Sequence, residues 1–186
     1  MRQATIIQLT GLSGAGKTTL AQGVKHLLEK DALKVVIIDG DVYRKTLCKD
    51  LGFSKEDRME NIRRLGAAAF SFKDQADIIM IAAINPFEET RNELKEKYDT
   101  RTVWVKCNMP VLIERDTKGL YKRALLHDKH PDKLFNLTGI NDIYEIPVSP
   151  DLVIDTSTAT PGQCIRQLYE FLILPGVSYF HRPAGG

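Results

Sequence analysis

Gly11-Leu12-Ser13-Gly14-Ala15-Gly16-Lys17-Thr18 is the stretch of sequence that decides the fold. It fits the pattern G-x-x-x-x-G-K-[ST], a phosphate-binding loop that joins a buried strand to a helix. The flanks agree, because an apolar run precedes the loop and apolar residues at helical spacing follow it. The run contains Ile6, Ile7 and Leu9, and the helical positions are Leu20, Val24, Leu27 and Leu28. An ordinary glycine-rich turn would not require Lys and Thr in this register, so we predict a nucleoside-triphosphate site.

The chemistry of this loop follows from its backbone. Glycines allow successive N–H groups to point inward, which forms a nest for phosphate oxygens at the N-terminus of a helix. We expect Lys17 to reach the β- and γ-phosphates of the nucleotide and the Thr18 hydroxyl to bind Mg²⁺.

Composition limits the remaining possibilities. A length of 186 residues suits one domain with a substantial core. The formal net charge of +2 is too small to indicate a nucleic-acid partner. Cys48, Cys107 and Cys164 form no C-x-x-C pair, which favours reduced thiols and a cytoplasmic protein. No apolar run approaches the ~20 residues of a membrane span, and no signal-peptide pattern precedes the first strand, so we expect no membrane partner.

Apolar runs alternate with amphipathic segments along the chain. This alternation predicts an α/β fold with a five-stranded parallel sheet covered by helices on both faces. The predicted strands are Ile6–Leu9, Val35–Ile38, Ile78–Ile84, Val103–Lys106 and Leu152–Ile154. The predicted helices are Lys17–Glu29, Tyr43–Cys48, Lys55–Lys73, Phe87–Lys97, Pro110–Arg115 and Pro161–Leu174.

One region breaks the alternation. Residues 116–150 are polar and lack a strand pattern, which is typical of a disordered loop or of a mobile lid beside a nucleotide site. We therefore expect one domain over residues 1–174 with a lid at about 116–150, followed by a tail at 175–186.

Asp39-Gly40-Asp41 follows the second predicted strand. Beside a phosphate-binding loop, one carboxylate could hold Mg²⁺ and the other could orient or deprotonate an attacking hydroxyl. A structural alternative is that Asp41 caps the following helix, and the two roles are compatible. We predict functional roles for both Asp39 and Asp41.

A second helix start lies at Ser54, which forms the capping box S-x-x-[DE] with Asp57. From that start, Arg58, Asn61 and Arg64 lie roughly on one face of the helix. Without further information, a solvated basic helix is the simpler interpretation of this segment.

Several longer motifs weaken that simpler interpretation. They are Asp39-Gly40-Asp41-x-x-Arg44, Leu51-Gly52-Phe53-Ser54-x-x-Asp57-Arg58-x-x-Asn61-Ile62-Arg63-Arg64, Glu114-Arg115-Asp116-x-Lys118-Gly119-Leu120-Tyr121-Lys122 and Thr138-Gly139-Ile140. Together with the phosphate-binding loop, and in this order, they resemble the adenylylsulfate kinase (APS kinase) family from about Ile6 to Asp155.

The resemblance implies a three-layer P-loop kinase fold with a mobile lid, and usually a homodimer. It also implies transfer of the ATP γ-phosphate to the 3′-hydroxyl of adenosine 5′-phosphosulfate (APS). Under it, Lys17, Asp39 and Asp41 are catalytic, with Asp41 as the base, and Thr18 and Asp39 hold Mg²⁺. ATP is bound by Gly11, Leu12, Ser13, Gly14, Ala15, Gly16, Lys17, Thr18, Thr19 and Arg115. The acceptor nucleotide is bound by Asp41, Arg44, Phe53, Arg58, Asn61, Arg64, Ile84, Asn85, Lys118 and Leu137.

The sequence departs from the family pattern on the acceptor side. Asn85-Pro86-Phe87-Glu88 stands where the family typically has Ser-Pro, an aromatic residue or His, and then Arg or Lys. Leu137 replaces a Phe that would stack on adenine. The lid also carries extra residues that include His127-x-x-His130. Two histidines at this spacing could bind a metal, but we expect a solvated loop. A kinase for another nucleotide-like acceptor, such as a cytidine diphosphate derivative, and a non-catalytic nucleotide-binding protein therefore stay as alternatives.

Overall fold

The computed structural model describes residues 4–173 and contains one five-stranded sheet in which all neighbouring strands are parallel. The order across the sheet is β2-β3-β1-β4-β5. The strands are β1 (Thr5–Thr10), β2 (Val35–Asp39), β3 (Ile78–Ala82), β4 (Arg101–Lys106) and β5 (Leu152–Asp155). The predicted α/β class and the five parallel strands are confirmed. The predicted tail at 175–186 and the last residue of the final predicted helix lie outside the described residues.

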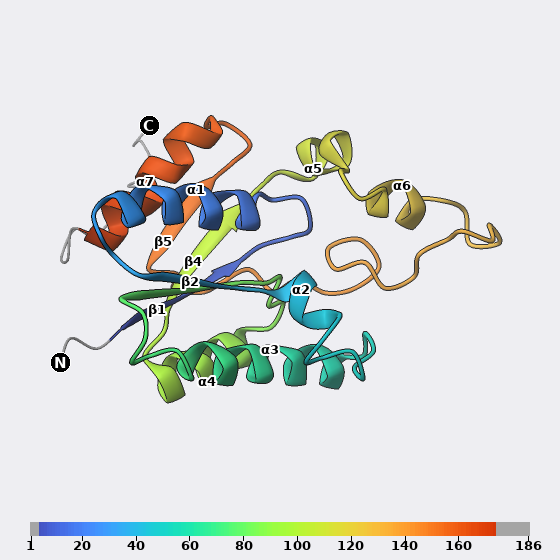
Figure 1. Cartoon of the computed structure of the whole chain (residues 1–186). Helices are drawn as coiled ribbons and strands as arrows, with labels where there is room; N and C mark the ends of the chain where they lie inside the picture. Colours follow the sequence, from blue (N-terminus) through green and yellow to red (C-terminus); the bar gives the residue numbers. More distant parts are fainter. Residues whose placement is uncertain (1–3, 174–186) are drawn as a thin grey trace.

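Helices cover both faces of this sheet, as Figure 1 shows. The pair α1 and α7 packs on one face, while α3 and α4 lie on the other. The helices are α1 (Lys17–Lys30), α2 (Gly40–Arg44), α3 (Lys55–Phe70), α4 (Glu88–Tyr98), α5 (Met109–Arg115), α6 (Leu120–Ala124) and α7 (Pro161–Ile173). Within residues 4–173, no helix has the length and apolar character that a membrane crossing demands.

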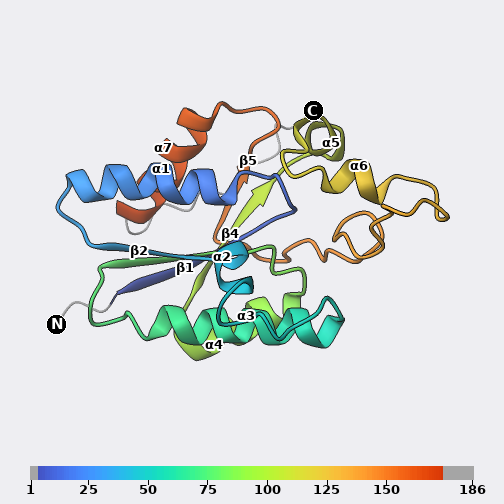
Figure 2. The same ribbon diagram turned by 45° about the vertical axis from the view of Figure 1, so that its right-hand side comes forward.

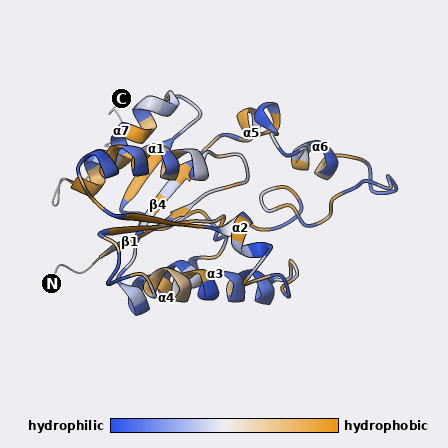
Figure 3. Ribbon diagram, viewed as in Figure 1, coloured by the Kyte–Doolittle hydropathy of each residue, from blue (hydrophilic) through white to orange (hydrophobic). Residues whose placement is uncertain are grey.

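The core is divided by the sheet into two apolar layers. In β1, the side chains of Ile6 and Ile7 enter opposite layers, because successive strand residues point to opposite faces. Ile7 packs with α1 and α7, and Ile6 packs with α3 and α4. All five residues of β3 are buried, as expected for a strand that is covered on both faces. Figure 3 shows this arrangement as hydrophobic strands between helices that carry both hydrophilic and hydrophobic residues.

The carboxyl ends of the strands lie along one edge, where loops collect beside α2 (Figure 2). The segment from α5 through α6 to β5 extends beyond this edge in both views. It includes the predicted lid, and it holds the short helix α6, which the sequence pattern did not predict. In this segment, the described residues form one isolated β-bridge, between Thr138 and Asp142.

The helix predicted at Tyr43–Cys48 is wrong in position. Helix α2 begins at Gly40, directly after β2, because Asp39 caps it with a carboxylate that accepts from the N–H groups of Asp41 and Val42. Residues 45–50 form turns instead. Strand β3 also ends two residues early, at Ala82, and the chain then enters a left-handed turn at Asn85.

Candidate active site

The phosphate-binding loop joins β1 to α1 and leaves the N-terminus of α1 open. Gly16 occupies the N-cap position with a left-handed φ of 99°, so no side chain caps the helix. Gly11 passes so close to β4 that a Cβ atom there would lie 2.3 Å from the carbonyl oxygen of Val105. Because free N–H groups and the helix dipole both favour anions, this end of α1 is suited to phosphate.

Lys17 lies inside this loop, at the start of α1. Its Nζ donates to the carbonyl oxygens of Gly11 and Leu12, both at 2.8 Å. Burial is the main cause that lowers the pKa of Lys17 from 10.5 to about 8; the charge of Asp41 opposes the shift and that of Lys118 adds to it. A phosphate oxygen near Nζ would restore the charged form, since an opposite charge favours it.

Thr18 and Asp39 provide oxygen atoms for a cation. The Thr18 hydroxyl donates to Oδ2 of Asp39 at 2.7 Å, while Oδ1 of Asp39 caps α2. Hydroxyl and carboxylate oxygens are the ligands that Mg²⁺ prefers, so these residues fit the predicted metal. The alternative role as helix cap, suggested for Asp41 from the sequence, belongs to Asp39, and Asp41 lines the cavity instead.

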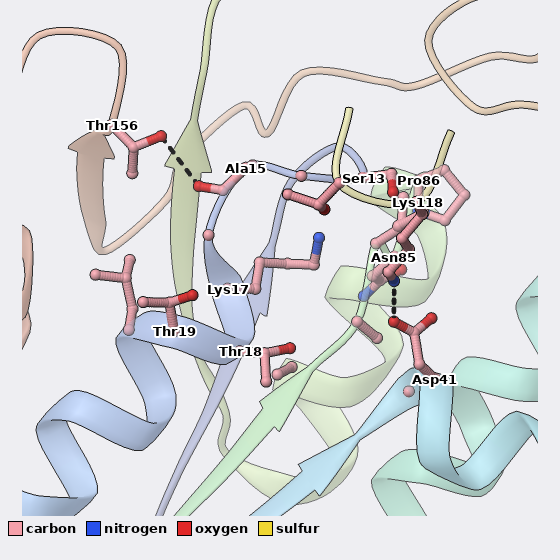
Figure 4. Close-up of a pocket in the computed structure, with 18 of the residues that line it drawn as sticks. Ser13, Ala15, Lys17, Thr18, Thr19, Asp41, Asn85, Pro86, Lys118 and Thr156 are labelled. Atoms are coloured by element: carbon pink, nitrogen blue, oxygen red, sulfur yellow. Dashed lines mark hydrogen bonds and ion pairs between the residues drawn. The ribbon is translucent and has the colours of Figure 1, made fainter. Parts of the chain in front are cut away.

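Asp41 and the lid meet at one ion pair. The carboxylate of Asp41 contacts Nζ of Lys118, and Figure 4 shows both side chains beside Lys17 and Thr18. The side chain of Asp41 is 70% exposed, so it remains accessible to a ligand in this cavity.

A buried tyrosine fastens the lid to the phosphate-binding loop. The hydroxyl of Tyr121 in α6 donates to the carbonyl oxygen of Ser13 at 2.8 Å, and burial raises the pKa of Tyr121 to about 12.

Arg115, at the end of α5, donates to the carbonyl oxygen of Thr156 at 2.6 Å. The Thr156 hydroxyl in turn donates to the carbonyl oxygen of Ala15, a contact drawn in Figure 4. Arg115 is thereby held at the wall of the cavity beside the phosphate-binding loop.

The opposite wall of the same cavity carries positive charge around an aromatic ring. Phe53 is 53% exposed, and the guanidinium groups of Arg44 and Arg58 lie 4.9 and 5.4 Å from its ring centroid. Burial, followed by the charge of Arg58, lowers the pKa of Arg44. Asn61 lines this wall too, and its buried Oδ1 atom has no hydrogen-bond partner among residues 4–173. A concave wall with cations, an aromatic face and an unpartnered amide oxygen is suited to an anionic, ring-containing ligand.

Both walls enclose one cavity of about 800 Å³. The lining includes residues from the segments that follow β1, β2 and β3 and from the lid, and it includes most of the predicted site residues. It also includes residues that the sequence reasoning missed: Leu20, Gly40, Lys45, Ile62, Ala82, Ala83, Pro86, Thr117, Thr156, Ala159, Pro161 and Cys164. Thr156 follows β5 at the same edge of the parallel sheet as the phosphate-binding loop, a signal that could have identified it.

The family follows from comparison with known proteins. A family model described as Adenylylsulphate kinase matches residues 3–155, most of the chain. The chain belongs to the adenylylsulfate kinase family. It is 42% identical over 173 residues to the adenylyl-sulfate kinase of Bacillus licheniformis, which covers 91% of this chain and 85% of that relative.

Solved structures of the adenylylsulfate kinase family agree. APS kinase from Mycobacterium tuberculosis in complex with AMPPNP and APS superposes with a TM-score of 0.84 at 29% identity, over 92% of this chain and 99% of that one. A hexameric APS kinase from Thiobacillus denitrificans gives a TM-score of 0.65 at 27% identity, over 92% of this chain and 29% of that one. The predicted recognition and the P-loop kinase fold are confirmed.

Two residues predicted on the acceptor side from the family pattern lie away from the cavity. Arg64 pairs with Asp50 and Glu60 on the outer side of α3. Leu137 is buried, with 5% exposure, in the apolar layer on the α1 side. Neither lines the cavity, whereas Ile84 and Asn85 do. On the donor side, Gly11, Leu12 and Asp39 are not among its lining residues either.

Two further departures from the adenylylsulfate kinase pattern are explained by packing. Glu88 pairs with the buried Arg91 at 2.7 Å and does not line the cavity, so its negative charge is balanced by its own helix. In the lid, Nδ1 of His130 accepts from the N–H of Asp132. Within residues 4–173, no three His, Cys, Asp or Glu side chains gather as metal ligands would.

Proposed function

We propose that this chain transfers the γ-phosphate of ATP to the 3′-hydroxyl of APS, giving 3′-phosphoadenylylsulfate and ADP. The observation that carries the proposal is one cavity with a phosphate-binding loop on one wall and Arg44, Phe53 and Asn61 on the other. Asp41 lies with Lys118 where these walls meet the lid. Family membership supports ATP as donor, and the structure from Mycobacterium tuberculosis is a complex with AMPPNP and APS.

On the donor side, the loop N–H groups and Lys17 bind the polyphosphate, and Arg115 borders the remainder of the nucleotide. Thr18 and Asp39 would hold Mg²⁺, which supplies charge neutralisation of the phosphates when bound. Because Lys17 is partly desolvated, its charge stabilises the transferring phosphoryl group more strongly than it would in water.

On the acceptor side, Asp41 takes the proton of the 3′-hydroxyl as its oxygen bonds to the γ-phosphorus. The bond from that phosphorus to the bridging oxygen breaks, and ADP leaves. Lys118 contributes positive charge near the transferring group, and the lid excludes water that would otherwise compete as acceptor. Phe53 stacks on adenine, a contact that contributes about 1–3 kcal/mol by analogy with base–aromatic stacking.

Recognition of the phosphosulfate follows from charge. On this wall, burial and the neighbouring guanidinium of Arg58 lower the pKa of Arg44. An anion that binds there relieves the repulsion between these two cations. Arg58 is more constrained, since it bonds the Thr138 hydroxyl and the Asn136 carbonyl and pairs with Asp142 at 2.7 Å. We infer that Arg58 mainly holds the lid segment 136–142 against α3. It also adds positive charge to the wall that binds the acceptor.

A direct assay tests this function. Purified protein with MgATP is offered APS and, separately, adenosine 5′-monophosphate and a cytidine diphosphate derivative, and ADP release is coupled to a spectrophotometric signal. We expect turnover of APS at micromolar concentration and little with the others. Turnover restricted to another acceptor would contradict the proposal, and so would ATP binding without any transfer.

We also propose a homodimer in the cytoplasm. Ile143, Ile146 and Val148 are exposed along the segment that leads to β5, which supports a contact with a second copy. Free Cys48, Cys107 and Cys164 and the use of ATP support a reducing, cytoplasmic setting. Light scattering after size exclusion tests the assembly: a mass of one chain, or of six, would contradict the dimer.

A further inference from the structure

Asn85 adopts a backbone conformation that most residues avoid. Its φ is +41°, and Asn85 lies shortly after the end of β3 at Ala82, at the cavity wall between Ile84 and Pro86. Left-handed backbone crowds Cβ against the following carbonyl group, and Asn, after Gly, tolerates it best. The turn that forms this part of the acceptor wall therefore depends on which residue occupies position 85.

The side chain of Asn85 is turned into the protein and is 3% exposed. Its Nδ2 donates to Oε1 of Gln8 at 2.8 Å, and its Oδ1 accepts from the Thr90 hydroxyl at 2.6 Å. Gln8 continues this network to the hydroxyls of Thr100 and Thr102. The amide is thus bonded on both sides within the core, between β1 and α4.

The main chain of the same turn is bonded to the start of the phosphate-binding loop. The Thr10 hydroxyl donates to the carbonyl oxygens of Ile84 and Asn85, at 2.6 and 3.0 Å. The N–H of Gly11 also donates to the Ile84 carbonyl, at 3.3 Å. The acceptor wall and the donor loop are therefore fixed relative to each other through this turn.

The returning end of the lid is bonded to the same turn. Glu145 donates its N–H to the carbonyl oxygen of Pro86 at 2.8 Å, and its carboxylate accepts from the N–H of Glu88 at 2.6 Å. The buried Arg91 joins both segments, because it donates to the carbonyl oxygens of Asn85 and Glu145. Three parts of the site, the loop, the acceptor wall and the lid, converge on residues 84–88.

We propose that Asn85 is a positioning residue for phosphoryl transfer. Its amide is held by Gln8 and Thr90, and its left-handed backbone sets the wall formed by Ile84 and Pro86 against the phosphate-binding loop. It acts through the main chain, and its side chain does not contact the acceptor. The inference rests on the proposed function, because that function defines the acceptor.

Two variants separate backbone conformation from side-chain contact. Asn85→Ala removes the amide and disfavours the left-handed turn, whereas Asn85→Gly removes the same amide but adopts that turn without steric cost. In steady-state assays, we expect Asn85→Ala to raise the KM for APS about tenfold or more, and Asn85→Gly about threefold at most. The KM for MgATP should stay within about twofold in both variants.

Asp99 provides a matched control, since it has a positive φ of 51° at the exposed end of α4, away from the cavity lining. Asp99→Ala and Asp99→Gly should change the melting temperature without changing the KM for APS. Equal KM increases for Asn85→Ala and Asn85→Gly would overturn the proposal, because they would show that the effect follows the lost amide and not the left-handed backbone. An unchanged KM in a destabilised Asn85→Ala would also overturn it, by showing a purely structural role.

A second readout separates this inference from the proposed function. If the wild-type protein does not turn over APS, the function fails, and crystal structures of both variants with an ATP analogue then decide the role of Asn85. We expect the main chain at residues 84–86 to move away from Gly11 in Asn85→Ala and to keep its place in Asn85→Gly. An unmoved turn in Asn85→Ala would overturn the inference.

Discussion

Lys118 forms an ion pair with Asp41, although 77 positions separate the two residues in the sequence. Lys118 belongs to the lid, and Asp41 belongs to the first turn of α2. Their contact brings a cation of the lid onto the proposed base beside the phosphate-binding loop. A nucleotide that binds at Asp41 would therefore either replace Lys118 or contact both side chains.

Replacement of Asp41 should affect the chemical step. We expect Asp41→Asn to lower kcat about 10²- to 10⁴-fold, the range of general-base effects, with little change in the KM for MgATP. Steady-state kinetics with both substrates measure this split. Asp74→Asn, in the exposed loop before β3, is the control for loss of one negative charge. A KM effect at full kcat would mean that Asp41 only binds substrate.

Binding of MgATP should weaken above pH 8. The pKa of Lys17 in the nucleotide-free protein is about 8, and the polyphosphate binds its charged form. Below pH 8 that form is already present; above it, binding must take up a proton, so affinity falls as the pH rises. Isothermal titration in buffers of different ionisation enthalpy measures the proton uptake. Lys17→Arg should remove this pH dependence, and Lys17→Ala should nearly abolish turnover in a folded protein.

The same pKa shift predicts that the free energy of unfolding increases as the pH rises, whereas the affinity for MgATP decreases. The unfolded chain keeps a lysine pKa near 10.5, so it binds more protons than the folded protein between pH 8 and 10.5. The contribution of Lys17 to the free energy of unfolding therefore increases as the pH rises through that window. Comparison of urea denaturation at pH 8 and pH 10 for wild-type and Lys17→Met proteins isolates it. A pH trend identical in both proteins would contradict the assignment.

Thr18 should control the dependence on Mg²⁺. Thr18→Ala removes the hydroxyl that bonds Asp39, so we expect a higher Mg²⁺ concentration for half-maximal rate and a lower kcat. Thr18→Ser keeps the hydroxyl and should restore most of the activity. The rate is measured against Mg²⁺ at fixed ATP. Equal behaviour of the Ala and Ser variants would exclude the hydroxyl as a ligand.

Phe53 and Leu137 should behave differently, although the family pattern places both near adenine. Phe53→Ala should raise the KM for APS by a factor equivalent to about 1–3 kcal/mol. Phe135→Ala, another exposed aromatic outside the cavity lining, should not. Because Leu137 is packed in the core, Leu137→Phe should cost about 1–3 kcal/mol of stability without lowering that KM. Improved APS binding by Leu137→Phe would contradict this packing.

The sequence anticipated the site unevenly. Local structure was predicted correctly where neighbouring residues set it: Gly11–Thr18 join a strand to a helix, and Ser54 caps α3 by accepting from the N–H of Asp57, as the capping box indicates. The cap of α2 was assigned to the wrong aspartate, since Asp39 and Asp41 both suit the role by residue type. Arg64 and Leu137 were placed by family position, and only packing shows that they face away from the cavity.

The sequence by itself determined the alternation of strands and helices, the phosphate-binding loop and the family. These depend on local periodicity and on backbone geometry that short motifs encode. The tertiary structure alone decided how distant residues meet: Lys118 with Asp41, Tyr121 with Ser13, and Asn85 with Gln8. Such contacts depend on the packing of whole layers and on the demand of each buried polar group for a partner, which no local pattern specifies.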